Sequence, residues 1–153
     1  MYLKKEKENN ESGFTLIELL IVIIIIGILA AIAFIAYNGT QNKAHKAAAQ
    51  STLSEVRDKL GEYNADNSTY PATISDVDNW ISSSAGGNNT TLASTFTTAN
   101  GYVYAVTPSG CGDTVASGGA ITTGSTACTG YTLTADATIW GDSNTADNIN
   151  VTN

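Results

Sequence analysis

The chain has little of several residue types on which catalytic and metal sites commonly depend. Its 153 residues include two cysteines and a single histidine, His45, which lies between Lys43 and Lys46. One histidine far from both cysteines does not make a zinc site of the usual four-ligand kind. No nucleophile and base can be combined around a solvated His45. We therefore predict no catalytic residue, no cofactor, no metal site and no enzymatic activity.

Basic residues are also missing from most of the chain. The net charge is −7, and no Lys or Arg follows Lys59, although acidic residues continue as far as Asp147. An acidic surface repels a phosphate backbone and cannot release its counterions. We expect no nucleic-acid binding by this part of the chain, whose charge we interpret as a solvated surface.

One long apolar run stands out against this polar background. Between Leu19 and Ala36 there are eighteen residues without a charge. At a rise of about 1.5 Å per residue they form a helix of about 27 Å, close to the hydrocarbon thickness of a bilayer. The run therefore predicts a membrane span. Lys4, Lys5 and Lys7 precede it and bias the N-terminus slightly toward the inside.

The rest of the chain divides by composition around this span. A short charged segment, residues 1–13, precedes the apolar helix of residues 14–37. Asn38, Gly39 and Thr40 form a weak point, after which an amphipathic continuation is predicted over residues 38–64. Its apolar stripe has the spacing of one helix face, with Ala49, Leu53, Val56, Leu60 and Tyr63. Residues 65–153 form a body rich in Thr, Ser, Asn and Gly.

The body has the signals of a small antiparallel sheet. A short helix is predicted near Ile74–Ile81, with Ser75 as its N-cap, followed by a loop over Ser82–Thr91. The sequence predicts strands, several with period-two alternation, over Tyr102–Thr107, Val115–Ser117, Ala120–Thr123, Tyr131–Ala135 and Thr138–Trp140. The predicted fold class is α+β, a long N-terminal helix packed against this sheet.

Both cysteines, Cys111 and Cys128, lie in the body. Small exported domains often use a disulfide, since their cores are marginal. If the body is exported, we expect a bridge that contributes about 3 kcal/mol in the chain-entropy model. Two unrelated buried thiols are the alternative, because spacing alone does not determine pairing.

The most specific motif precedes the apolar run. It reads Gly13-Phe14-Thr15-Leu16-Ile17-Glu18, and it resembles the processing site of type IV prepilins, a likeness that covers about the first sixty residues. The resemblance implies a prepilin leader over residues 1–13, cleavage between Gly13 and Phe14 by a prepilin peptidase, and N-methylation of Phe14. It also implies a role in filament assembly for Glu18, and a pilin-like fold.

Elementary energetics also single out Glu18. A carboxylate inside a membrane helix costs about 2.5–3.5 kcal/mol on insertion scales and needs a reason. Cleavage after Gly13 would create an amine at Phe14, four positions from Glu18, and pairing between neighbouring stems would set their register. An incidental Glu in a plain anchor is the alternative. Whether the stem unwinds at Gly27 on assembly is left open by the sequence.

Three functional hypotheses follow from these features. The leading one is a structural subunit of a type IV pilus, inserted in the membrane with its N-terminus inside, then extracellular, and serving adhesion, motility or DNA uptake. Its partners would be copies of itself, the peptidase and the assembly machinery. A pseudopilin of a type II secretion system is the second, and a demonstrated calcium site near Asp142, Asn144 and Asp147 would favour it. A secreted or anchored binding module, cut after the small residues Ala31-Ile32-Ala33, is the third.

Overall fold

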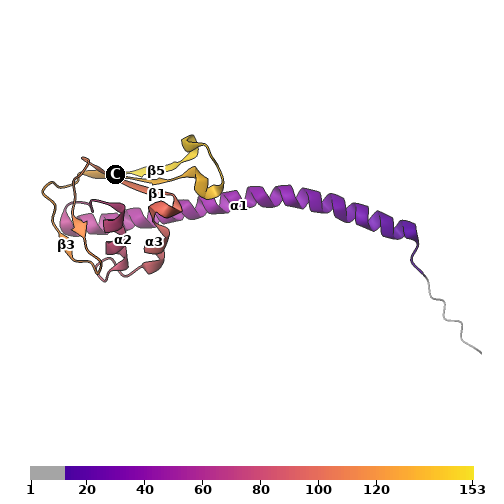
Figure 1. Ribbon diagram of the computed structural model, residues 1–153, viewed down its shortest axis with the longest axis horizontal. Helices are drawn as coiled ribbons and strands as arrows, with labels where there is room; N and C mark the ends of the chain where they lie inside the picture. The colour runs from indigo at the N-terminus through magenta and orange to yellow at the C-terminus, as the bar shows by residue number, and fades with distance from the viewer. Residues whose placement is uncertain (1–12) are drawn as a thin grey trace, which may run out of the picture. The chain divides into compact units, whose positions relative to one another are not determined.

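The computed structural model describes residues 13–153, except the side chain of Asn38. The chain divides into two compact units, one that ends at Gly39 and one from Thr40 to Asn153. Helix α1, Leu16–Asn67, contributes to both units (Figure 1). The weak point predicted at Asn38–Thr40 does not interrupt this helix. The second unit, called the head below, contains all the other helices and strands of the described residues.

The two parts of α1 differ in what their side chains meet. In the first unit the large apolar side chains are exposed. In the head, the predicted stripe is buried, and its members are Ala49, Leu53, Val56, Leu60 and Tyr63. The amphipathic stripe is thus confirmed as the face on which the head packs, since burying apolar area is the main favourable term in folding.

Helix α1 ends at Asn67, three residues beyond the predicted end of its amphipathic part at residue 64. The Asn67 side-chain amide donates to the carbonyl of Tyr63 at 3.0 Å, and Ser68 adopts a positive φ of 57°. The backbone N–H of Ser68 donates to the carbonyl of Asn64 at 2.8 Å. These bonds satisfy carbonyls that have no partner in the helix itself.

Two short helices follow, and the sequence predicted only one of them. Helix α2, Ile74–Ser82, is capped by Thr73, not by Ser75 as predicted. Thr73 and Asp76 form a reciprocal capping box, in which each side chain accepts from the other's backbone N–H. Helix α3, Thr90–Thr95, begins at the end of the predicted loop and is capped by Asn89. Its six residues are too few for a helical period to show in the sequence.

The head contains two small antiparallel sheets. Strands β1 (Tyr102–Thr107), β4 (Gly130–Ala135) and β5 (Ile149–Thr152) pair in the order β1-β4-β5. Leu133 in the middle strand is paired with Tyr104 of β1 and Val151 of β5. Strands β2 (Thr114–Val115) and β3 (Ile121–Thr122) form a separate pair. The α+β class is confirmed, and β5 is a strand that the sequence analysis missed.

The predicted strand over Thr138–Trp140 is wrong. These residues belong to a 3₁₀ helix, Ala137–Trp140. The Asp136 carboxylate accepts the backbone N–H of Thr138 at 2.9 Å, and this bond holds the pKa of Asp136 below its usual value. Gly141 then ends the helix with a φ of 77°, a conformation that favours glycine. Two further 3₁₀ turns cover Thr98–Asn100 and Thr145–Asp147.

Aromatic side chains fill much of the core between α1, α2 and the larger sheet. Tyr63 and Trp80 meet edge to face, with ring centroids 5.2 Å apart. Tyr70 and Tyr131 form a second edge-to-face pair at 4.8 Å. Such pairs contribute about 0.5–1.5 kcal/mol beyond the area that they bury. They compensate for the scarcity of large aliphatic residues in the body.

The cysteine loop, residues 111–128, is attached to this core by a disulfide and by buried polar groups. Cys111 and Cys128 are bonded, with Cα atoms 5.1 Å apart. Buried Asp113 accepts the Tyr63 hydroxyl at 2.9 Å and the Gly124 N–H at 2.9 Å. Burial, and then the bond to Asp113, raise the pKa of Tyr63.

A second buried carboxylate attaches the same loop to α2. The free oxygen of the α2 capping box, Oδ1 of Asp76, accepts the Val115 N–H at 2.7 Å. At the other end of the loop, the Cys128 N–H donates to the Thr69 hydroxyl at 2.8 Å. Polar groups without a buried partner would cost free energy here, so these bonds determine how the loop lies on the core.

Removing the Asp113 carboxylate should therefore destabilise the head. Asp113→Ala leaves the buried Tyr63 hydroxyl and Gly124 N–H without an acceptor, so we expect a loss of about 1.5–3 kcal/mol in unfolding free energy. Urea unfolding of the detergent-solubilised chain, followed by tryptophan fluorescence, measures it. Exposed Asp66 is the control, and Asp66→Ala should change stability by no more than about 0.5 kcal/mol. Equal effects of the two variants would contradict this role of Asp113.

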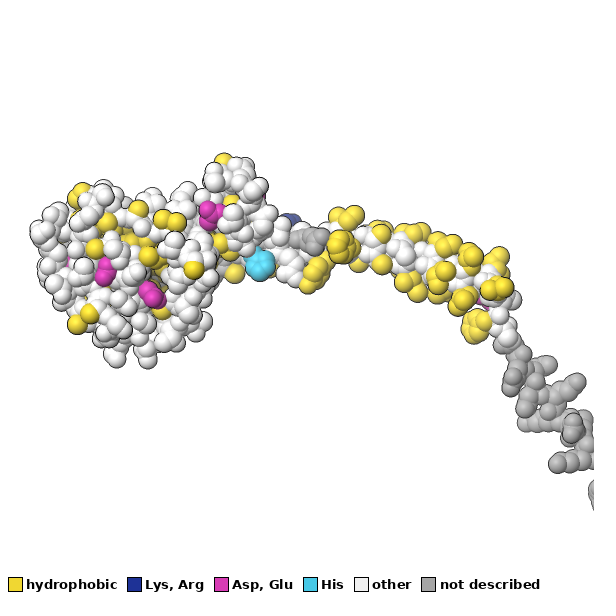
Figure 2. Space-filling view, viewed as in Figure 1, with side chains coloured by type: hydrophobic (Ala, Val, Ile, Leu, Met, Phe, Trp, Pro, Cys, Tyr) yellow, Lys and Arg dark blue, Asp and Glu magenta, His cyan; other side chains and the backbone are white. Residues whose placement is uncertain are grey.

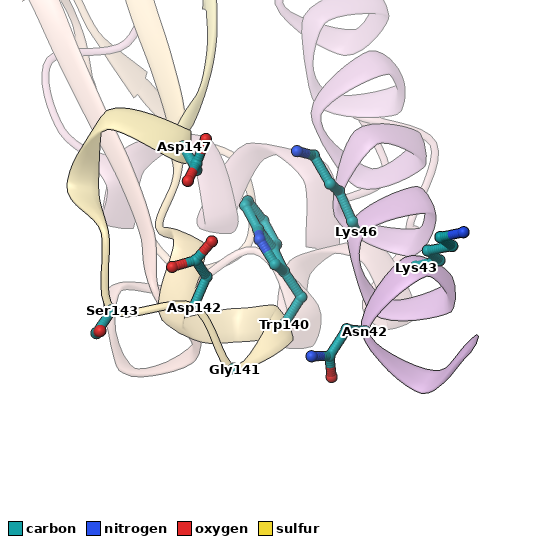
Figure 3. A pocket seen from close by; sticks show the side chains of 8 residues that line it. All are labelled: Asn42, Lys43, Lys46, Trp140, Gly141, Asp142, Ser143 and Asp147. Atoms are coloured by element: carbon teal, nitrogen blue, oxygen red, sulfur yellow. The ribbon is translucent and has the colours of Figure 1, made fainter. Parts of the chain in front are cut away.

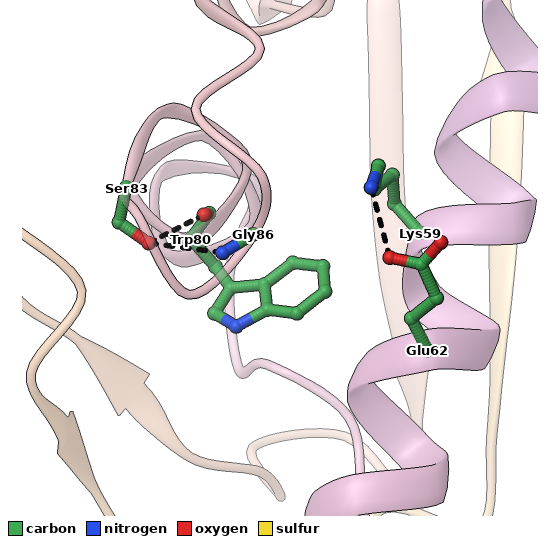
Figure 4. Close-up of polar contacts among 5 residues, drawn as sticks. All are labelled: Lys59, Glu62, Trp80, Ser83 and Gly86. Carbon is green, nitrogen blue, oxygen red and sulfur yellow. Dashed lines mark hydrogen bonds and ion pairs between the residues drawn. The ribbon is translucent and has the colours of Figure 1, made fainter.

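Close packing of the turn after α2 requires a glycine. The Ser83 hydroxyl donates to the Trp80 carbonyl at 2.7 Å and accepts the Gly86 N–H at 3.3 Å (Figure 4). A Cβ atom at Gly86 would overlap with the backbone carbonyl of Trp80. On the neighbouring α1, Lys59 and Glu62 form an exposed ion pair at 2.8 Å, also drawn in Figure 4. Such a surface pair contributes little.

Glycine-to-alanine substitutions should consequently have opposite effects at two positions. Gly86→Ala should lower the unfolding free energy by about 1–3 kcal/mol, because the backbone of Trp80 must move. Gly61 lies exposed on α1, and a Cβ atom added there would have no neighbour within 4 Å, so Gly61→Ala should stabilise by up to about 1 kcal/mol. The same urea titration compares the two variants, and a Gly86→Ala variant as stable as the wild type would show that the close approach at Gly86 has no energetic consequence.

Candidate functional site

The candidate site is the start of α1, where the sequence motif lies. Of the predicted leader, residues 1–13, only Gly13 is among the described residues. Gly13, Phe14 and Thr15 precede the helix, which begins at Leu16. Phe14 is 92% exposed. The Gly13–Phe14 bond thus lies in an accessible, non-helical segment immediately before a helix.

Glu18 is held by a local network that the sequence analysis did not anticipate. Its Oε2 accepts the backbone N–H of Thr15 at 2.8 Å and the Thr15 hydroxyl at 2.7 Å. In return the Glu18 N–H donates to the Thr15 hydroxyl at 3.3 Å. This is the reciprocal pattern of a capping box, in which two otherwise unpaired donors at the helix start are satisfied. The signal was present as Thr15-x-x-Glu18 before an apolar run.

The capping box gives Glu18 a structural reason that does not depend on a second chain. It orients the carboxylate toward the helix N-terminus, where the aligned peptide dipoles favour a negative charge. Because the carboxylate accepts the backbone N–H of Thr15, it lies at the end of the helix that Phe14 precedes. A positive charge at Phe14 and the carboxylate of Glu18 would then lie within a few residues of each other.

Beyond Glu18, the surface of this part of α1 is apolar on all sides. Its large side chains, from Leu16 to Tyr37, are about half exposed or more, and hydrophobic atoms cover the face seen in Figure 2. By length and composition α1 is able to cross a membrane, and it is the one such helix among the described residues. Apolar area of this extent requires lipid or another protein surface around it.

The other candidate residues do not gather into a site. His45 is an exposed residue of α1, and within residues 13–153 no group of three or more His, Cys, Asp or Glu side chains could hold a metal ion. Asn144 donates to Asp142 at 2.9 Å and to Asp147 at 3.1 Å, which closes a turn. Gly27 is exposed within the uninterrupted α1, and unwinding there stays a prediction.

Fold and motif together define the class of protein. A long N-terminal helix combined with a small antiparallel sheet is a pilin-like α+β architecture. Residues 9–34 match the family model described as the prokaryotic N-terminal methylation motif. This prepilin-type leader motif is characteristic of type IV pilins and pseudopilins. Comparisons of the chain with curated proteins and with solved structures give no match.

Proposed function

We propose that the chain is the precursor of a structural subunit of a type IV pilus. In this proposal a prepilin peptidase cuts between Gly13 and Phe14 and methylates the new amine, and the subunits then polymerise through α1. The observation that carries the proposal is the methylation motif at residues 9–34, followed directly by an exposed apolar helix. The leader motif and the apolar helix fit a membrane-anchored precursor, and the pilin-type family that the motif characterises consists of structural subunits.

The exposed helix supports polymerisation as well as anchoring. In a membrane, lipid covers the apolar side chains of residues 16–37, and a filament must cover them equally well once they leave it. Packed copies of the same helix supply such an environment. In this proposal the acidic surface of the head keeps the filament soluble and gives its sides no affinity for duplex DNA.

Glu18 would set the register of the packed stems. A methylated amine keeps its positive charge, and the amine of Phe14 is the cation that the processed stem itself supplies at this depth. A stem that docks out of register leaves its carboxylate without a partner in a medium of low polarity, which is strongly unfavourable. Correctly docked stems pair the charge with a neighbour's amine.

A secretion pseudopilus stays the alternative proposal, and a demonstrated calcium site in the C-terminal turn would favour it. In that turn Asp142 and Asp147 accept hydrogen bonds from Asn144, so backbone carbonyls and waters would have to supply most of the six to eight oxygen ligands that calcium prefers. We propose adhesion or motility as the role of the filament, and DNA uptake would require a different subunit at the tip to bind the DNA.

The mature protein should begin at Phe14 and carry one methyl group on its α-amine. Intact-mass analysis of sheared surface material, with sequencing of the first residues, measures both features. Gly13→Leu is the informative variant, because a branched side chain at the cut site should leave the leader attached. A mature chain that begins after Ala33 would refute the pilus proposal, since that cut removes most of the apolar helix.

Glu18 should be required for assembly but not for folding of the head. Glu18→Ala and Glu18→Gln remove the charge, so we expect normal membrane insertion and a formed Cys111–Cys128 disulfide, but few or no filaments. Counting sheared filaments by electron microscopy measures assembly. Non-reducing peptide mapping of the membrane fraction measures folding.

Thr15→Val separates the two roles of Glu18. This variant loses the hydroxyl of the capping box and about 1 kcal/mol of helix-start stability, but it keeps the carboxylate. Near-normal filament numbers in Thr15→Val and loss in Glu18→Gln would support charge pairing. Normal numbers in both Glu18 variants, or equal loss in Thr15→Val, would show that pairing with Phe14 is not what the residue does.

A further inference from the structure

A groove in the head has charged walls that the proposed function does not use. Its volume is about 430 Å³, and it lies between the first turns of α1 in the head and the loop between the 3₁₀ helix at Trp140 and strand β5. Figure 3 shows Lys46 extending from α1 toward Trp140, with Asp142 and Asp147 on the loop opposite. Asn42 and Ser143 add polar groups at the edge.

Charges of both signs line the groove, and within the described part of the chain they do not form ion pairs with one another. Lys43 and Lys46 line one side, although the Lys43 amine is turned away in Figure 3, and Asp142 and Asp147 line the other. Within residues 13–153 the ion pairs are Arg57–Asp58 and Lys59–Glu62, and neither includes a residue of the groove. Opposite charges that face one space without pairing fit a ligand that carries both signs.

Each wall is held in place by neighbouring groups. The Lys46 ammonium lies 5.4 Å from the centroid of the Trp140 ring, a cation–π distance. Asn144 donates to one oxygen of Asp142 and one of Asp147. A carboxylate has about four acceptor sites, so one such bond leaves each group able to accept more. The walls are therefore ordered before any ligand arrives, which lowers the cost of binding.

The position of the groove along the chain identifies the source of such a ligand. Asn42 and Lys46, on the α1 side of the groove, follow Tyr37, the end of the apolar stretch, by five and nine residues. In any backbone conformation these lengths of chain span at most about 18 Å and about 32 Å. In the membrane-anchored precursor the groove is thus tethered close to the lipid headgroups, at a high local concentration of one kind of small charged molecule.

We propose that this groove binds the zwitterionic headgroup of a phospholipid with a primary amine, a phosphoethanolamine lipid. Lys46 would pair with the phosphate diester, and Asp142 and Asp147 would accept hydrogen bonds from the ammonium group. This inference rests on the membrane-anchored state of the proposed function. Its role would be to hold the head against the membrane until the subunit is extracted into a filament.

Competing lipids match the groove less well. A choline headgroup carries a quaternary ammonium that has no N–H to donate to the aspartates. A phosphatidylglycerol headgroup has no cation, and the two carboxylates repel its phosphate. The primary amine is therefore the feature that should determine selectivity.

Native mass spectrometry of the full-length mature chain in detergent tests the proposal. Ethanolamine, choline and glycerol phospholipids with the same acyl chains are added in equal amounts, and the single-lipid adducts are compared. We expect the ethanolamine lipid to be retained about tenfold more than either competitor, the effect of one or two charge-assisted hydrogen bonds. Lys46→Gln and the double variant Asp142→Asn with Asp147→Asn should each remove this preference.

Matched controls lie elsewhere on α1. Arg57→Gln and Asp66→Asn make the same kinds of charge change at exposed positions outside the groove, and both should keep the wild-type preference. Equal retention of the three lipids, or groove variants that behave like the controls, would overturn the proposal. So would preference for the glycerol lipid with sensitivity to Lys46 alone, because that pattern is plain attraction to an anionic surface.

Two further measurements are needed. One shows whether the ligand is a lipid or a free headgroup, and the other shows which proposal fails if no lipid preference is found. Soluble glycerophosphoethanolamine, titrated by NMR, should bind at least tenfold more weakly than the lipid, and equal affinity would contradict a membrane role. Resistance of the chain to alkaline extraction from membranes tests the anchored precursor itself. A chain that is anchored but shows no lipid preference refutes only the groove, whereas a chain that is not anchored refutes the anchored state on which both proposals depend.

Discussion

The protein depends first on one constraint, that a helix with apolar side chains on every side cannot remain in water. Residues 16–37 of α1 bury almost nothing within the chain, so a membrane or other copies of the helix must provide the cover. The remainder of α1 solves a different problem, because its single apolar stripe is covered by the head. The first part of this continuous helix therefore needs cover from outside the chain, whereas the second part is covered by the head of the same chain.

The head in turn folds with few large apolar residues, and it compensates with aromatic pairs and with buried carboxylates. Asp76 and Asp113 each accept bonds from distant parts of the chain, which attach the cysteine loop to α1 and α2. A disulfide closes that loop. This arrangement lets a segment of mostly Thr, Ser and Gly hold a defined shape, because every buried polar group that anchors it has a partner.

Charge is used in three distinct ways along the chain. At the start of α1, one carboxylate closes a capping box at the point where the motif places cleavage. In the core, buried carboxylates accept the hydrogen bonds that attach the cysteine loop to α1 and α2. On the head surface, acidic groups dominate, and only the first turns of α1 in the head oppose lysines to them across a groove. The groove proposal and the filament proposal thus draw on different charges, although both depend on the membrane-anchored state.

Local signals determined much of this from the sequence alone. Neighbouring residues are sufficient to identify three features. The apolar run is recognised by its length without a charge, the Gly13–Glu18 motif by its fixed spacing, and the stripe from Ala49 to Tyr63 by its helical period. The main strands β1 and β4 were predicted from their alternation for the same reason. The capping box of Thr15 and Glu18 also had its signal in the sequence, although we did not use it.

Tertiary structure alone decided the rest, since the deciding contacts join residues far apart in the chain. Strand β5 exists because Leu133 and its neighbours in β4 offer it a pairing edge. The 3₁₀ helix that contains Thr138–Trp140 is held at its start by a bond from the Ala137 N–H to the Asn148 side chain, eleven residues away. Asp113 became a central acceptor only when folding brought Tyr63, fifty residues away, to its side. The groove likewise requires Lys46 and Trp140 to meet, and no local pattern in either segment specifies the other.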